Sequence, residues 1–157
     1  MHIRWAIAAV VVMLAVFFAG YDLSQTPSFT TNQPAAASSA NAVGVTYTNA
    51  SENDIFITVP SAGAVITNSI VIEGFARGGW YFEASFPIVV TGRNGMVIAT
   101  GNGTAIGDWT TSSYVPFTAK VDIKDLYNGP ATVTLKNDNP SGDPTKDKRL
   151  SFPVMVQ

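Results

Sequence analysis

Two carboxylates stand among the aromatic residues of this sequence, Glu83 in "GGWYFEASFPIVV" and Asp108 in "GDWTTSSYVPF". Their residue types are those of a glycosidase pair, in which one carboxyl protonates the leaving group and the other acts as nucleophile or base. A cell-wall glycan hydrolase using Glu83 is therefore one hypothesis. The alternative is that Glu83 is structural and accepts hydrogen bonds from Arg77 or from the backbone amides of "NPSG", residues 139–142. We favour the structural interpretation, because the only histidine is His2 and no Ser-His or Cys-His site is available.

The aromatic residues themselves offer a second kind of site. Trp80, Tyr81 and Trp109 would make a platform for a sugar or a peptide, with Arg77 close by in sequence. Tryptophan that is buried with its N–H satisfied is commoner than tryptophan on a binding surface, so packing in the core or at its rim is the favoured alternative. These four residues are the candidates for contact with a ligand or partner.

Residues 137–147, "NDNPSGDPTKD", have the oxygen-rich composition of a calcium loop. An EF-hand count from Asn137 places Lys148 where a bidentate glutamate is required, and Pro140 interrupts the loop. A different calcium site between Asp138, Asp143 and Asp147 stays open, but a solvated hairpin loop is the favoured interpretation. The sequence contains no cysteine, which excludes thiolate metal sites and disulfides. We predict no metal and no cofactor.

Alternating apolar residues from Ile55 onward predict the strands that would position these side chains. Seven short runs are separated by Gly, Pro and Asn turns, including Asn94-Gly95, which is typical of a hairpin. The segments begin near residues 55, 70, 82, 96, 115, 131 and 150. They predict an all-β fold, a seven-stranded antiparallel immunoglobulin-like β-sandwich. In the third run, Phe82, Ala84 and Phe86 would face the core and Glu83 would face away from it.

Three prolines within these runs, Pro87, Pro116 and Pro153, predict edge strands or bulges, since proline cannot donate to a strand ladder. Basic and acidic residues are equal in number from Ile55 onward, which leaves no net charge for a polyanion and excludes nucleic acid as a partner.

The N-terminus carries an unbroken apolar run from Trp5 to Phe18, preceded by Arg4 and followed by Ala19 and Gly20. We expect residues 1–21 to form a single transmembrane anchor that spans the membrane through residues 5–20, with the C-terminal part outside the cytoplasm. The alternative is a signal segment whose cleavage leaves a secreted protein. Residues 22–54, rich in Ser, Thr, Asn and Ala and uncharged from Leu23 to Ser51, would form a flexible linker, and residues 55–157 would form the sandwich domain.

Four stretches occur in an order that resembles a known family: "SIVIEGFARGGWYFEASFPIVV", the Asn94-Gly95 turn, "GDWTTSSYVPF" and "NPSG". The chain is similar from about residue 55 to its end to the immunoglobulin-like domain of bacterial spore germination. The residues that carry the resemblance are Gly74, Ala76, Trp80, Phe82, Glu83, Phe86, Gly107, Trp109, Pro116, Phe117, Asn139, Pro140, Ser141 and Gly142. Of these, Phe82, Glu83, Phe86 and residues 139–142 are expected to be a structural signature.

The resemblance implies a non-enzymatic, extracytoplasmic module of the bacterial cell envelope. We expect it to be tethered to the cell membrane and to contact an envelope protein or a cell-wall component. A purely structural spacer is the other non-catalytic hypothesis.

Overall fold

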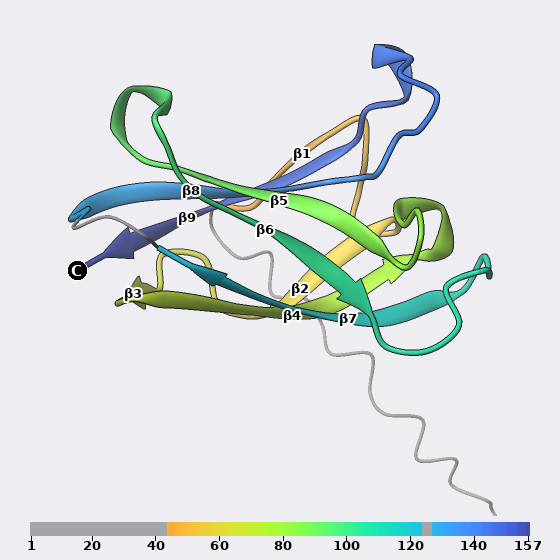
Figure 1. Ribbon diagram of the computed structural model, residues 1–157, viewed down its shortest axis with the longest axis horizontal. Helices are drawn as coiled ribbons and strands as arrows, with labels where there is room; N and C mark the ends of the chain where they lie inside the picture. The colour runs from red at the N-terminus through yellow and green to blue at the C-terminus, as the bar shows by residue number, and fades with distance from the viewer. Residues whose placement is uncertain (1–43, 124–126) are drawn as a thin grey trace, which may run out of the picture. The chain divides into compact units, whose positions relative to one another are not determined.

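The computed structural model describes residues 44–123 and 127–157, which form nine β-strands and three short 3₁₀ helices (Figure 1). The strands are β1 (Thr46–Thr48), β2 (Ile55–Val59), β3 (Val65–Ile66), β4 (Ser69–Arg77), β5 (Ser85–Thr91), β6 (Val97–Ala105), β7 (Tyr114–Asp122), β8 (Gly129–Lys136) and β9 (Arg149–Val156). The helices are η1 (Gly78–Trp80), η2 (Arg93–Gly95) and η3 (Pro144–Lys146). The prediction of an all-β fold is confirmed.

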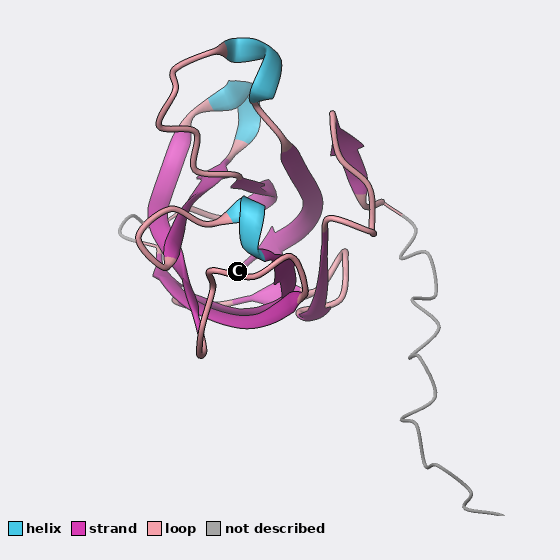
Figure 2. Ribbon diagram, turned by 90° about the vertical axis from the view of Figure 1, so that its right-hand side faces the viewer, coloured by secondary structure: helices cyan, strands magenta, loops and turns pink. Residues whose placement is uncertain are grey.

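The strands follow the spatial order β1-β9-β8-β5-β6-β7-β4-β2, and the neighbours in this order are antiparallel. β3 pairs with β9 in parallel. Figure 2 shows the strands curling around a common interior. β6 connects the strands β1, β9, β8 and β5 to the strands β7, β4 and β2. It pairs with β5 along its length but with β7 only through its last two residues.

Two of the nine strands lie outside the seven predicted runs. β1 pairs with β9 and lies inside the segment predicted as linker, so the folded part begins before residue 55. β3 has two residues, which is too short for an alternating pattern to be visible in the sequence. In residues 44–123 and 127–157 no helix reaches the length and apolarity that crossing a membrane requires; the predicted anchor, residues 5–20, falls outside these ranges.

The core is built by strict alternation along the longer strands. In β4 every second residue is buried, and β7, β8 and β9 show the same period of two. Phe86 of β5 lies at the centre, with its ring centroid 5.0 Å from that of Phe117 and 5.3 Å from that of Tyr81. Gly103 of β6 makes room for this ring, since a Cβ built on it would come within 2.4 Å of Phe86.

The prediction placed the three prolines in edge strands or at bulges. They lie in neither, because their strands are interior and the register does not shift at any of the three. Pro87, Pro116 and Pro153 belong to β5, β7 and β9, which have neighbours on both sides in the strand order. Each proline lies where its strand is unpaired on one side. Pro87 comes before the residues of β5 that pair with β8, and Pro116 lies outside the two-residue pairing of β7 with β6. Pro153 lies between the residues of β9 that pair with β1 and those that pair with β3. The missing N–H is therefore placed in a gap of the ladder.

Candidate functional site at the loop end

Four loops meet at one end of the described fold, which we call the loop end: residues 49–54, 78–84, 106–113 and 137–148. The register places them together, because β4 ends beside the starts of β2 and β7, and β8 ends beside the start of β9. The last three loops lie on the right-hand side of Figure 1. The site residues predicted from the sequence lie in these loops or within two residues of them.

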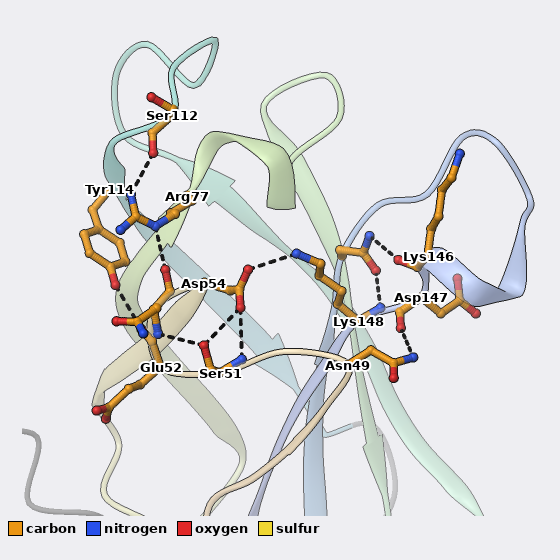
Figure 3. A network of polar contacts seen from close by, with 12 residues as sticks. Asn49, Ser51, Glu52, Asp54, Arg77, Ser112, Tyr114, Lys146, Asp147 and Lys148 are labelled. Carbon is orange, nitrogen blue, oxygen red and sulfur yellow. Dashed lines mark hydrogen bonds and ion pairs between the residues drawn. The ribbon is translucent and has the colours of Figure 1, made fainter.

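Arg77, at the end of β4, ties two of these loops together (Figure 3). Its Nε donates to the carbonyl oxygen of Asn53 at 2.6 Å, and its Nη1 donates to the carbonyl oxygen of Ser112 at 2.9 Å. The guanidinium also lies over the Tyr114 ring, 4.5 Å from its centroid. These contacts replace the expected pairing with Glu83.

Gly78 brings the 106–113 loop against η1. A Cβ on Gly78 would lie 1.8 Å from the carbonyl oxygen of Thr111 and 2.4 Å from that of Trp109, so only glycine fits. Trp109 is half-buried against the core. Its neighbour Asp108 accepts from the hydroxyl and the amide of Thr110, at 2.6 and 2.8 Å, and these two bonds lower the pKa of its carboxyl.

Trp80 and Tyr81 are core residues and not a surface platform. Trp80 is 2% exposed and its ring packs edge-on against Phe86, while its Nε1 has no hydrogen-bond partner among the described residues. The hydroxyl of Tyr81 donates to the carbonyl oxygen of Val115 at 3.0 Å. Burial raises the pKa of Tyr81 to about 12.

Glu83 is exposed, but the predicted strand alternation is not the reason. β5 begins at Ser85, and Glu83 and Ala84 form the two-residue turn of a tight hairpin with positive φ angles of 50° and 60°. Phe82 and Ser85 close the hairpin through two backbone hydrogen bonds, of 3.0 and 3.1 Å. Phe82 is therefore exposed as well, contrary to the prediction that it faces the core.

The "NPSG" residues organise the 137–148 loop from within. The side-chain amide of Asn139 donates to the carbonyl oxygen of Asp143 at 2.8 Å and to Oδ1 of Asp147 at 2.9 Å. Ser141 Oγ donates to Asn139 Oδ1 at 2.6 Å. Gly142 takes a positive φ of 66°, and Pro140 is exposed beside it. The backbone amide of Asp138 joins this loop to η1 by donating to the carbonyl oxygen of Trp80 at 3.0 Å.

A shallow, open depression of about 530 Å³ lies between η1 and this loop. It is lined by Gly79, Asn137, Asp138, Asn139, Pro140, Ser141, Thr145, Lys146 and Lys148. Asp143 is occupied in capping η3, where it accepts from the hydroxyl and the amide of Thr145, and these bonds lower the pKa of its carboxyl. No three acidic, histidine or cysteine side chains come together to hold a metal ion in the part of the chain that the structure describes.

Asp108 and Glu83 do not have the surroundings expected of the acid of a glycosidase pair. A catalytic acid needs a pKa raised towards neutrality, whereas the hydrogen bonds of Asp108 act in the opposite direction. Glu83 is exposed to solvent in a two-residue turn, whereas burial among apolar residues is what raises the pKa of such an acid.

Several residues that hold the loop end together were not found from the sequence. Asp54 and Lys148 form an ion pair of 2.9 Å between segments 94 positions apart, and the hydroxyl of Tyr114 donates to the carbonyl oxygen of Glu52 at 3.0 Å. Neither contact has a sequence signal, because no local spacing links the two partners.

Comparison with known proteins gives one match. The family model described as the immunoglobulin-like domain of bacterial spore germination matches residues 54–143, more than half of the chain. This confirms the resemblance seen in the sequence motifs. Neither the search of curated proteins nor the search of solved structures returned a match.

Proposed function

We propose, on the premise that this chain belongs to the family of immunoglobulin-like domains of bacterial spore germination, that it is a non-enzymatic binding module held outside the cytoplasm by its N-terminus. Its ligand would be another component of the cell envelope, bound at the loop end. The N-terminal apolar run after Arg4 supports the tether, and the family membership supports a non-catalytic module.

One observation carries the proposal: the four loops of the loop end are fixed to one another by specific contacts. Arg77 binds the 49–54 and 106–113 loops. Gly78 lets the 106–113 loop pack against η1 of the 78–84 loop, and Asp138 attaches the 137–148 loop to η1. Loops that a rigid scaffold positions in this way are where β-sandwich domains commonly place their binding residues. The chain enters the described fold at Gly44, which lies beside Pro153 in the middle part of β9 and not in one of the four loops.

The tether is tested on the full chain in a bacterial membrane. We expect the protein to stay with the membrane after a high-pH wash and its domain to be digested by protease added to intact spheroplasts. Deletion of residues 1–21 should abolish export. Release of a shortened protein into the medium would show a cleaved signal segment instead.

Binding is tested with solubilised wall glycan fragments and with detergent extracts of the envelope as separate probes. Trp109→Ala is the informative variant because Trp109 is only half-buried, whereas Trp80→Ala would disturb the core. We expect Trp109→Ala to weaken binding of one probe while the fold is retained. If neither probe is retained by the wild-type domain, the spacer hypothesis replaces this one.

A further inference from the structure

The hairpin formed by residues 82–85 has an unusual turn. Both central residues, Glu83 and Ala84, lie in the left-handed region, which favours asparagine and glycine. The same chain uses the favoured residues elsewhere: Asn94 and Gly95, between β5 and β6, have φ angles of 58° and 74°. A glutamate at a position that strains its backbone points to a role for its side chain.

The hairpin is held firmly on both sides. The aromatic residues that flank it, Tyr81 before and Phe86 after, are both buried. The amide of Ala105 in β6 donates to the carbonyl oxygen of Ala84 at 2.8 Å. The turn is therefore attached to the core and to β6.

Phe82 is the exception among the aromatic residues of this stretch. Trp80, Tyr81 and Phe86 are at most 4% exposed, whereas Phe82 is 42% exposed. A large aromatic side chain presented on a rigid turn loses little conformational entropy on binding, and such residues dominate the energy of protein interfaces.

The charge of the surrounding loops indicates the chemistry of the occupant. The four loops of the loop end contain the carboxylates Glu52, Asp54, Glu83, Asp108, Asp138, Asp143 and Asp147 and the cations Lys146 and Lys148. Arg77, Lys136 and Arg149 lie directly next to these loops, so carboxylates exceed cations by two, seven against five. Lys148 is already paired with Asp54. A negative surface of this kind attracts a positively charged partner and repels an acidic one.

We propose that the 82–85 hairpin is the contact through which this domain binds a basic protein partner. Phe82 enters an apolar pocket of the partner, and the carboxylate of Glu83 pairs with a lysine or arginine at the rim of that pocket. This inference rests on the proposed function, since it names the contact and the partner class of the loop end.

The first experiment maps the contact in living cells with the full chain. A photo-crosslinking phenylalanine analogue replaces Phe82 in one variant and Val97 in another. Val97 is also exposed and lies at the start of β6, away from the loop end. We expect a protein crosslink from position 82 and none from position 97, with the crosslinked segment of the partner rich in lysine and arginine.

The second experiment measures affinity, with a synthetic peptide of that crosslinked segment as the probe. Phe82→Ala should weaken binding at least about tenfold without lowering the melting temperature, because Phe82 is not a core residue. Glu83→Gln should weaken binding about threefold at low salt, and the difference should shrink as ionic strength rises. The double variant Glu83→Asn with Ala84→Gly should raise the melting temperature by about 5 °C and still weaken binding, a combination that a purely structural role does not produce.

The outcomes separate this inference from the proposed function. A crosslink to an acidic segment or to a second copy of the chain overturns the inference, as does wild-type affinity in all three variants. If Trp109→Ala reduces binding of an envelope probe but position 82 does not crosslink, the proposed function stands and the hairpin is not the contact. If no envelope probe binds and no crosslink forms, both fail.

Discussion

Lys148 Nζ lies 2.9 Å from Asp54 Oδ1, so the residue before β9 is joined to the residue before β2. Asp54 also accepts from the amide and hydroxyl of Ser51, at 3.0 and 3.2 Å. Burial raises the pKa of the Asp54 carboxyl, but the hydrogen bonds from Lys148 and Ser51 outweigh it and leave this pKa below its ordinary value.

Asp54→Asn should therefore lower the free energy of unfolding by about 1 kcal/mol at neutral pH. Because the folded pKa is depressed, the contribution of Asp54 is present above its unfolded pKa and is lost as pH falls through its folded pKa. Urea denaturation from neutral pH down to about pH 2 should show a gap between wild type and variant that closes with acid. The control is Asp122→Asn, since Asp122 forms a 3.7 Å pair with Lys120 in which both side chains are about two-thirds exposed. An equal loss in both variants would contradict the prediction.

Arg77→Lys should destabilise the domain by about 1–2 kcal/mol although it keeps the positive charge. A lysine cannot donate to the carbonyl oxygens of Asn53 and Ser112 together, because its ammonium lacks the planar fork of the guanidinium. Arg149→Lys is the matched control, as the guanidinium of Arg149 makes an exposed 4.0 Å contact with the carboxylate of Asp147. Hydrogen exchange should show faster opening of residues 49–54 and 106–113 in the Arg77 variant. Unchanged exchange there would contradict the prediction.

Gly78→Ala and Gly79→Ala form a matched pair of adjacent substitutions. The Cβ at Gly78 would overlap the carbonyl oxygens of Thr111 and Trp109, and backbone cannot yield as a flexible side chain does, so we expect a loss of about 3 kcal/mol. The Cβ at Gly79 would meet no atom within 4 Å, so stability should stay within about 1 kcal/mol of wild type. The midpoint of chemical denaturation measures both, and similar midpoints for the two variants would show that the 106–113 loop does not rest on Gly78.

Tyr81 should make the domain sensitive to alkali. Its folded pKa is raised, so its stabilising contribution is present below the unfolded pKa of about 10 and is lost as pH rises towards about 12. Tyr81→Phe should cost about 1 kcal/mol at neutral pH, because the carbonyl oxygen of Val115 loses its donor. The variant should also lose less stability than wild type between about pH 10 and about pH 12. Parallel pH profiles for the two proteins would rule out this role.

Strand content could be predicted because the buried and exposed positions alternate plainly. β4, β7 and β9 show the period of two in their sequences, and Asn94-Gly95 marks its turn by residue type. The pattern was misleading at residues 82–84, where Phe82 and Ala84 continue the alternation into a turn that uses unfavoured residues. An alternating pattern shows which positions are apolar, but it does not show the backbone φ angle of any residue.

The arrangement of the candidate site could be predicted only in part. Arg77, Trp80, Tyr81 and Trp109 were singled out by type, and they do lie together at the loop end. Which of them is buried depends on η1 and on the close approach that Gly78 permits. The carbonyl oxygens that Arg77 binds belong to distant segments, and a backbone acceptor has no signature in the sequence.

The two strands at the ends of the spatial order, β1 and β2, are consecutive in the chain and are joined by only six residues. The hydroxyl of Tyr47 in β1 donates to the carbonyl oxygen of Ile55 in β2 at 3.3 Å. An open margin of a sheet is a template on which another molecule can add a strand, and covering it protects a protein from aggregation. Here the Tyr47 hydroxyl occupies one backbone acceptor of the β2 margin, and the six-residue connection ties the two margins to each other at the loop end.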